Sequence, residues 1–358
     1  MSVSDLCRDY HLPWLGADGK SKMGDVALGS RIRLARNFSR LPFPNRANMK
    51  ELAEVQNRAA SVFSDVESVV GQEFDVVGIE GLTPLERDVL VEKQLISRNL
   101  IKQPQYRSAY IAADRSSSIM VNEEDHLRIQ CMAPGLDLAR PYAVASKIDD
   151  TIESRLDIAF DEKMGYLTSC PTNLGTGLRA TVIVHLPGLV YTRNMQSIIN
   201  ISQQLGLSVR GLYGEGSETV GNIFSISNQM TLGFTEEGLI DNLTSAVTEI
   251  VEHERRARNA LIMYSKDRIE DAVWRAYGIL RYARSLGEGE TLELISKVRL
   301  GIDSGLLTGP RPETFSELLI ASRPSFLKNL AGNENLAGTE LSHERAAVVR
   351  KVLTDTSN

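Results

Sequence analysis

A change of pattern near Thr235 limits the folds open to this chain more than any other feature of the sequence. Before this point, short β-type runs bounded by glycine, proline or polar residues alternate with amphipathic helical stretches. After it, the apolar residues recur at helical spacing only. This order predicts a layered α/β or α+β domain followed by an all-helical domain. A chain of 358 residues buries roughly three quarters of its unfolded surface, which is enough for two cores.

The expected elements follow from these periodicities and from the turn residues between them. Strands are expected at 108–113, 118–121, 127–132, 165–168, 179–186, 208–212 and 222–227. Helices are expected at 50–70, 84–102, 137–160 and 193–205, and in the helical half at 237–264, 267–286, 291–304, 313–330 and 340–353. Pro324 should kink or split the helix in which it lies. We therefore divide the chain into an irregular, polar arm at 1–25, a mixed domain at 26–257 and a helical domain at 258–358.

Composition and charge exclude several classes of protein. No apolar run approaches the ~18 residues of a membrane span, and the first residues lack the pattern of a signal peptide, so we expect a cytoplasmic protein without a membrane partner. A formal net charge of −6 gives no electrostatic reason to expect nucleic acid as a partner. The three cysteines, Cys7, Cys131 and Cys170, are widely spaced and odd in number, which predicts reduced thiols. The five histidines show no ligand spacing, so no metal site made of protein side chains is expected.

Five arginines in the mixed domain carry most of the functional information. Arg31, Arg33, Arg128, Arg179 and Arg210 each lie beside apolar or small residues, which predicts that they point into a common cleft. Guanidinium groups bind phosphate oxygens in bidentate fashion and keep their charge at any working pH, so the cluster fits a triphosphate. The alternative for any one of them is a solvated strand face or a surface salt bridge. Taken together, the cluster predicts phosphoryl transfer.

Two glutamates fit a cationic acceptor. Glu124 lies in the run Asn-Glu-Glu-Asp, and Glu215 follows a Gly-Leu-Tyr-Gly turn. An enzyme that phosphorylates a guanidinium, whose pKa is above about 12, must orient it through carboxylates and remove a proton as the N–P bond forms. The apolar residues on both sides of the acidic run predict a strand, in which Glu123 and Glu124 face opposite ways and only one enters the cleft with Arg128. The alternative for this run is a solvated loop.

Four blocks, in the same order along the chain, resemble the phosphagen kinase superfamily, which includes the creatine and arginine kinases. They are 29–37, 122–128, 170–180 and 210–215. The resemblance implies an α+β catalytic domain with a mainly antiparallel central sheet flanked by helices, and Mg²⁺ that is carried by ATP. It gives Glu124 and Glu215 the task of orienting and deprotonating the guanidinium. It also places Cys170 against that group in a supporting role, since a loop thiol beside cationic groups is a plausible thiolate.

The same resemblance implies the other site residues. The expected catalytic residues are Glu124, Glu215, Cys170, Arg128, Arg179 and Arg210. The expected ATP-binding residues are Ser30, Arg31, Ile32, Arg33, Leu34, Gln94, Arg128, Arg179, Ala180, Thr181, Val182, Ile183, Arg210, Gly211, Leu212, Tyr213, Gly214 and Glu215. Ile183, Ser225 and Gln94 depart from the residues usual in the superfamily. These departures concern packing of the base, so they are expected to weaken nucleotide affinity without removing catalysis.

The position of the first arginine block separates subfamilies. Phosphagen kinases of free guanidino metabolites carry a helical domain before this block, whereas here the block begins at Ser30 and a helical domain follows instead. In this respect, and over essentially the whole chain, the sequence resembles the bacterial protein arginine kinases. The resemblance implies phosphorylation of arginine side chains in misfolded proteins and in a CtsR-type heat-shock repressor, which marks them for the ClpC/ClpP protease. It also implies an McsA-type activator and a homodimer formed through the helical domain.

Two other functions remain open at this point. One is a kinase of a free guanidino metabolite such as arginine or creatine, against which the missing front domain argues. The other is a non-catalytic adaptor that binds arginine-rich or phosphoarginine-bearing partners and delivers them to a protease. The retained glutamates and arginines argue against the adaptor, because such a protein has no need of a nucleotide site.

A short motif in the last expected helix bears on regulation. In the related kinases an Arg-Asp-x-x-Arg-Ala motif is implicated in an allosteric phosphoarginine site, and here the segment 341–346 keeps only Arg345 and Ala346. Loss of the first arginine and the aspartate removes an anion-binding fork and its cation partner. We therefore expect weak or no activation by phosphoarginine. The alternative is that Arg345 is an ordinary exposed helical residue.

Overall fold

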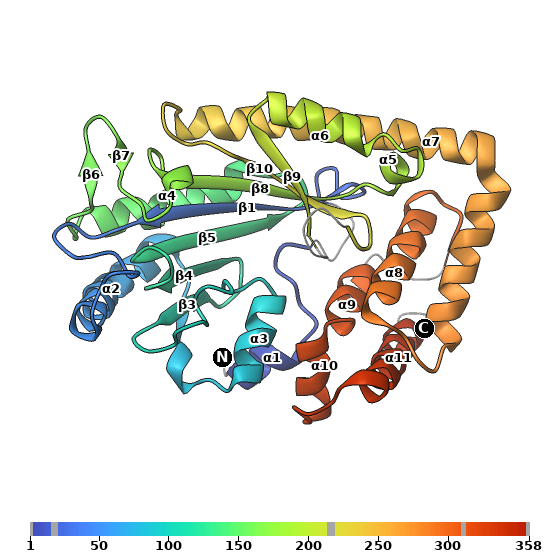
Figure 1. Cartoon of the computed structure of the whole chain (residues 1–358), viewed down its shortest axis with the longest axis horizontal. Helices are drawn as coiled ribbons and strands as arrows, with labels where there is room; N and C mark the ends of the chain where they lie inside the picture. Colours follow the sequence, from blue (N-terminus) through green and yellow to red (C-terminus); the bar gives the residue numbers. More distant parts are fainter. Residues whose placement is uncertain (1–2, 16–20, 213–218, 309–312, 356–358) are drawn as a thin grey trace.

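An eight-stranded sheet forms the centre of the computed structural model, which describes residues 3–15, 21–212, 219–308 and 313–355 (Figure 1). In spatial order its strands are β2 (Phe74–Gly78), β3 (Ser108–Ala112), β4 (Ser117–Val121), β5 (Leu127–Pro134), β1 (Ala27–Arg36), β8 (Leu178–His185), β10 (Ile223–Asn228) and β9 (Leu207–Gly211). Every neighbouring pair is antiparallel. Two short strands, β6 (Phe160–Asp161) and β7 (Gly165–Tyr166), form a separate hairpin. The antiparallel central sheet expected from the resemblance is confirmed.

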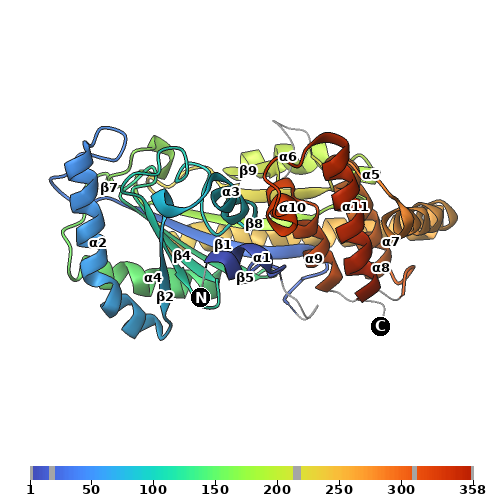
Figure 2. The same ribbon diagram turned by 90° about the horizontal axis from the view of Figure 1, so that it is seen from below.

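Helices cover one face of this sheet (Figures 1 and 2). They are α2 (Met49–Val70), α4 (Ala139–Glu153), α5 (Pro187–Tyr191), α6 (Met195–Gln204) and the first part of α7 (Glu236–Tyr282). Their apolar residues share one core with side chains of β1 and β8, such as Ile32 and Val182. Because side chains alternate along a strand, Arg31 and Arg33 of β1 point to the opposite face. One face of the sheet is thus buried by helices, whereas the opposite face carries polar side chains such as Arg31 and Arg33 beside apolar ones such as Ile183, which pack in a second cluster.

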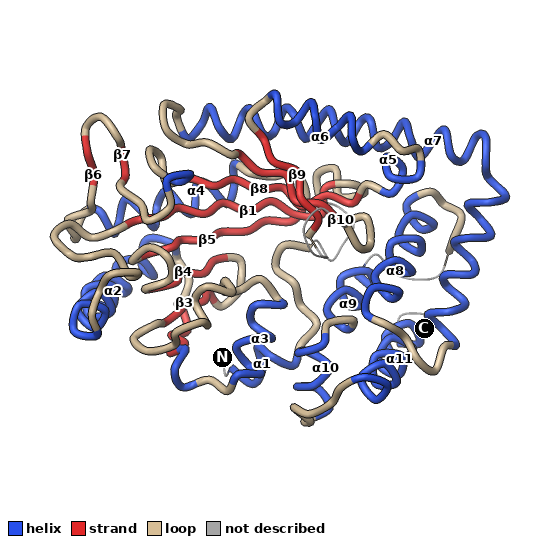
Figure 3. Tube along the Cα trace, viewed as in Figure 1, coloured by secondary structure: helices blue, strands red, loops and turns tan. Residues whose placement is uncertain are grey.

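The chain after residue 235 is helical, as predicted (Figure 3). α7 has a kink at Ser265, whose φ of −147° interrupts the helix where the sequence predicted a break. The helices α8 (Glu288–Asp303), α9 (Glu313–Ala321), α10 (Pro324–Ala331) and α11 (Gly338–Asp355) follow. Pro324 starts α10 and separates it from α9, so the predicted split is confirmed. None of the helices in the described ranges is long and apolar enough to cross a bilayer.

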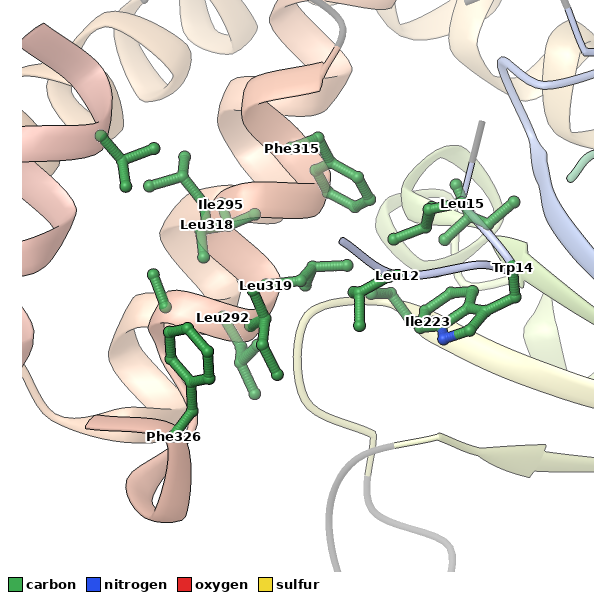
Figure 4. Close-up of a cluster of buried hydrophobic side chains, with 14 of the residues drawn as sticks. Leu12, Trp14, Leu15, Ile223, Leu292, Ile295, Phe315, Leu318, Leu319 and Phe326 are labelled. Carbon is green, nitrogen blue, oxygen red and sulfur yellow. The ribbon is translucent and has the colours of Figure 1, made fainter. Parts of the chain in front are cut away.

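The first residues of the chain do not form the irregular, polar arm that the sequence predicted. They contain a short helix, α1 (Val3–Arg8), and the side chains of Leu12 and Trp14 are almost completely buried. Figure 4 shows these side chains beside Ile223 of the sheet, in one hydrophobic cluster that also contains Phe315 of α9. The prediction was wrong because the few apolar residues of this segment have no periodicity. They become a core only where the sheet and the C-terminal helices meet around them.

Several elements differ in extent from the prediction. The sequence missed β2, β6 and the central strand β1, and the helix expected at 137–160 is shortened to α4. The helix expected at 84–102 ends as α3 (Pro84–Glu92), because Gln94 adopts a left-handed backbone with φ +60°. Apolar periodicity gave no sign of this end, since Leu95 and Leu100 remain fully buried beyond it.

Candidate active site

The five arginines predicted to share a cleft lie together on the face of the sheet opposite the covering helices. Alternation along β1 points Arg31 and Arg33 to this face. Arg179 of β8 is the register partner of Arg33, and Arg128 lies on the other neighbouring strand, β5. Arg210, near the end of β9, completes the set. All of them line one cavity of about 470 Å³, which we call the arginine cavity.

The guanidinium groups in this cavity repel one another. The Nε atoms of Arg31 and Arg33 are buried and have no hydrogen-bond partner among the described residues. Burial and the nearby charges of Arg128 and Arg179 together lower the pKa of Arg31 to about 10. Burial and the neighbouring arginines also lower the pKa of Arg33 well below its usual range. A cluster of this kind is favourable when a polyanion supplies the missing negative charge.

The acidic run lies in a loop, so the predicted strand is wrong at this point. Residues 122–126 connect β4 to β5, and Asn122 begins the connection with a φ of +58°. The loop is not solvated either, because Glu123 and Asp125 are each only 3% exposed. Strand alternation does not apply to a loop, and both Glu123 and Glu124 line the arginine cavity. Sequence analysis therefore missed Glu123 as a residue of the site.

The two glutamates have different surroundings. The carboxylate of Glu123 accepts a hydrogen bond from Ser97 Oγ at 2.5 Å and pairs with Arg128 Nη1 at 2.7 Å. Glu124 is half-buried, and its carboxylate has no hydrogen-bond donor within the described ranges. Burial raises the pKa of Glu124, and the negative charges of Glu123 and Asp125 raise it further. Glu123 thus positions an arginine, whereas Glu124 is free to bind a cation and to accept a proton.

The loop before β8 presents a thiol to the same cavity. Cys170 is partly exposed, and its Sγ lies 3.0 Å from Thr172 Oγ1. The hydroxyl of Thr231 donates to the carbonyl of Thr172 at 3.2 Å, which holds the loop from outside. Gly177 has a φ of +66°, and a Cβ at this position would come within 2.5 Å of Arg36 Nη1, so the close approach requires glycine. The loop is therefore held at both ends with its thiol at the cavity wall.

Comparisons with known proteins identify the family. The model of the ATP:guanido phosphotransferase C-terminal catalytic domain matches residues 54–257, and that of the protein-arginine kinase McsB C-terminal domain matches residues 266–358. Proteins named protein-arginine kinase from Desulforamulus reducens and Bacillus subtilis are 45% and 44% identical to this chain, covering 100% and 99% of it and 100% and 96% of their own lengths. The chain belongs to the protein-arginine kinase family.

Solved structures of other proteins share the fold of this chain. The duplicated taurocyamine kinase from Schistosoma mansoni matches with a TM-score of 0.59 and 24% identity, over 74% of this chain and 39% of that one. A lombricine kinase matches with a TM-score of 0.55 and 24% identity, over 69% of this chain and 71% of that one. At this level of identity the likeness concerns the fold alone, and it agrees with the antiparallel sheet and its covering helices.

The ATP-binding residues predicted for this kinase divide between the two faces of the sheet. Those that line the arginine cavity are Arg31, Arg33, Arg128, Arg179, Thr181 and Arg210. Those that belong to the core on the opposite face are Ile32, Leu34, Ala180 and Val182, of which Leu34 also borders the cavity. The division arises because the prediction took consecutive residues of a strand, whose side chains alternate. A nucleotide in the cavity would meet the second group through backbone atoms.

Four further positions named from the sequence differ in their surroundings. Gln94 accepts a hydrogen bond from Arg31 Nη1 at 3.0 Å and so helps to position that arginine. Ile183 is completely buried in the cluster shared with the C-terminal helices, whereas Ser225 lines the arginine cavity. The buried hydroxyl of Ser30 donates to the carbonyl of Gly135 at 2.8 Å, a contact that links β1 to the end of β5.

The last block of the expected site is described only in part. Gly211 ends β9, and Leu212 packs against the cluster shared with the C-terminal helices. Tyr213, Gly214 and Glu215 lie outside the described residues. The expected roles of these three residues stay predictions.

Arg345 and Ala346, the residues kept from the regulatory motif, lie on the buried side of α11. Nε of Arg345 donates to the carbonyl of Ser322 at 2.9 Å, and Nη1 donates to that of Leu286 at 2.9 Å. Arg345 is 3% exposed, so the alternative of an ordinary exposed helical residue is wrong. Burial lowers its pKa. The guanidinium ties α11 to the end of α9 and to the segment before α8.

Proposed function

We propose that this chain is an ATP-dependent protein-arginine kinase, which transfers the γ-phosphoryl group of ATP to arginine side chains of proteins. One observation carries the proposal: in a member of this family, a cluster of arginines faces the free carboxylate of Glu124 across a single cavity. The arginines fit a polyanion, and Glu124 fits a cationic acceptor. The names of the curated relatives favour an arginine within a protein over a free guanidino metabolite. A non-catalytic adaptor would need neither half of this site.

The proposed transfer uses groups on both sides of the cavity. A guanidinium nitrogen of the acceptor attacks the γ-phosphorus, the N–P bond forms, and the bond from phosphorus to the bridging oxygen breaks to leave ADP. The proton lost by the nitrogen passes to the carboxylate of Glu124. Arg33, Arg128 and Arg179 stabilise the negative charge of the transferred group as fixed cations in a closed site. Cys170 and Glu215 would orient the acceptor, as the family resemblance implies.

A divalent metal ion accompanies ATP in this family, and we propose that it is Mg²⁺. In the part of the chain that the structure describes, no three His, Cys, Asp or Glu side chains are grouped as in a metal site. The carboxylate of Glu123 is engaged by Arg128 and so does not offer a free ligand. Since Mg²⁺ commonly keeps waters and binds substrate phosphates with few protein ligands, we propose that the phosphate oxygens of ATP hold most of its coordination sphere.

We further propose the partners and setting that the family resemblance implies. They are a CtsR-type repressor and misfolded proteins as substrates, an McsA-type activator, the ClpC/ClpP protease as the reader of the mark, and a cytoplasmic location. We also propose a catalytic domain at 26–257 and a helical domain at 258–358, with a homodimer formed by the last part. Exposed aromatic side chains on α7, including Trp274 at 46% and Tyr282 at 70% exposure, support a protein contact there.

The decisive experiment detects phosphate on arginine directly. Purified protein is incubated with Mg·ATP and an unfolded protein such as casein, and the products are analysed by mass spectrometry at neutral pH, which preserves acid-labile N–P bonds. We expect phosphoarginine with the natural chain and none with Glu124→Gln or Glu215→Gln. Conversion of free arginine without any protein modification would overturn the proposal in favour of a metabolite kinase.

We also propose that free phosphoarginine activates this enzyme weakly or not at all. The support is that Arg345 already bonds two backbone carbonyls and that the first half of the motif is absent. The test is the rate of casein phosphorylation with and without millimolar phosphoarginine. A severalfold increase would refute the proposal.

A further inference from the structure

A second hollow joins the arginine cavity on the side of the acidic loop. It has a volume of about 650 Å³, within the range of about 300–1,000 Å³ typical of ligand sites. We call it the acceptor groove, and it is lined by Asn45, Met49, Leu52, Lys102, Gln103 and Arg107. It shares Asn99, Glu123 and Glu124 with the arginine cavity. The carboxylate of Glu124 is therefore accessible from both hollows.

The two hollows share Glu124 but are otherwise lined by different parts of the chain and have different chemistry. The arginine cavity extends from the acidic loop across the sheet to Arg210 and Ser227. The acceptor groove is lined by the start of α2 and the segment after α3, with exposed amides and the 55% exposed side chain of Met49 at its walls. A phosphate chain fits the first hollow. Amide groups that can donate and accept, beside an apolar side chain, fit a peptide in the second.

Two cations give the acceptor groove a preference for negative charge. Lys102 is exposed and close enough to Glu124 for its charge to act on that carboxylate. Arg107 is 9% exposed, and its Nη1 donates to the carbonyl of Asn99 at 2.6 Å, but its buried Nε has no partner among the described residues. Of the two acidic residues at the groove wall, Glu123 is paired with Arg128, and Glu124 is left for the guanidinium of the target arginine. A ligand that brings a carboxylate to the groove would complement Lys102 and Arg107.

We propose that the acceptor groove binds the polypeptide segment next to the target arginine, and that Lys102 favours an acidic residue in this segment. The inference rests on the proposed function and deepens it. The target side chain reaches Glu124 from the groove, while the phosphates of ATP approach from the arginine cavity. Because Lys102 is exposed, its effect is that of a solvent-screened ion pair and falls with added salt.

Two peptides test this proposal. They have the same length and a single arginine, and they differ only in the residue beside it, which is Asp in one and Lys in the other. Each is fluorescently labelled, and its binding is measured by anisotropy without ATP and its phosphorylation with Mg·ATP. The variants are Lys102→Glu and, as a matched change of charge on a remote exposed lysine of α4, Lys147→Glu.

For the natural chain we expect the Asp peptide to bind and react roughly three- to tenfold better than the Lys peptide at low salt, mainly through KM. Lys102→Glu should abolish or invert this ratio, and Lys147→Glu should leave it unchanged. If the two variants changed this ratio equally, or if the natural chain did not prefer the Asp peptide, the proposed role of the acceptor groove would be wrong. Binding that follows Lys102 without phosphorylation of either peptide would support the groove and overturn the proposed kinase activity.

Discussion

Two sets of buried arginines in this chain differ in what surrounds them. In the arginine cavity, the charges that act most strongly on Arg33 are those of other guanidinium groups. On the buried side of the same strand, Arg36 Nε donates to Asp149 Oδ1 at 2.9 Å, and its guanidinium lies 3.4 Å from the ring centroid of Tyr166. At the junction with the C-terminal helices, Arg258 is paired in the same way, with the carboxylate of Glu254 at 2.6 Å.

The difference separates arginines that bind a ligand from arginines that hold the fold. Burial acts to lower the pKa of Arg36, but Asp149 and Tyr166 outweigh it and the pKa is raised. Burial also lowers the pKa of Arg31, but here the neighbouring charges are those of other arginines, and they lower the pKa further. A buried cation without a partner is unfavourable unless a bound anion completes the site. Arg31 and Arg33 are therefore expected to serve activity, and Arg36 and Arg258 stability.

The largest effect is expected from the carboxylate that faces the unpaired arginines. Glu124→Gln should lower kcat about 10²- to 10⁴-fold, because an amide cannot accept the proton of the acceptor. ATP binding, measured by calorimetry, should be nearly unchanged, since the arginines remain. Glu340→Gln, an exposed change on α11, serves as the control. A kcat close to that of the natural chain would show that Glu124 is not the proton acceptor.

Removing a paired arginine should damage the fold. We expect Arg36→Met to lower the free energy of unfolding by about 3–5 kcal/mol, because it leaves the carboxylate of Asp149 buried without its partner. Urea unfolding followed by circular dichroism measures this change. The double variant Arg36→Met, Asp149→Leu should regain much of the loss, since neither charge is then buried. A loss below about 1 kcal/mol in the single variant would contradict a structural role for this pair.

Removing an unpaired arginine should lower the activity but leave the stability of the fold intact. Arg33→Met is expected to lower kcat/KM about 10²- to 10³-fold, as does loss of one donor that stabilises a developing anion. The free energy of unfolding should stay the same or rise, because a buried cation leaves a repulsive cluster. Both quantities are measured on the same preparation. Destabilisation as large as that of Arg36→Met would erase the distinction between the two sets.

The smallest effect concerns pH. The pKa of Glu124 is raised by burial and by the charges of Glu123 and Asp125. Its basic form is therefore lost as the pH falls through a value above the usual ~4.3 of a glutamate. We expect kcat/KM for a peptide to decrease severalfold on mild acidification, and the same limb of the profile to be absent from the residual activity of Glu124→Gln. An acidic limb that is identical in both proteins would assign the titration to another group.

Local patterns in the sequence predicted much of this fold. The change to helices after Thr235 and the split at Pro324 were correct because periodicity and proline act on neighbouring residues. The buried position of Trp14 escaped prediction, since its contacts come from the sheet and from helices late in the chain. The early end of α3 escaped as well, because it depends on the left-handed backbone of Gln94 and not on hydrophobicity.

The candidate site, too, could be predicted from the sequence only in part. The sequence motifs correctly predicted that Glu124 and the cavity arginines belong to one site. It assumed that the acidic run was a strand, and this assumption excluded Glu123, whose role depends on Ser97 and Arg128. It could not detect the acceptor groove, because the residues that line it come from the start of α2 and from the segment after α3.

By itself, the sequence determined which residues carry charge and where helices replace strands, because these properties depend on neighbouring positions. Only the tertiary structure decided which arginines receive a carboxylate. Arg33 and Arg36 lie three positions apart in β1, yet the partner of Arg36 is Asp149, 113 residues further along the chain. The register partner of Arg33 is Arg179. Contacts at such separation are set by the packing of strands and helices, and this packing leaves one arginine neutralised and the other available for an anion.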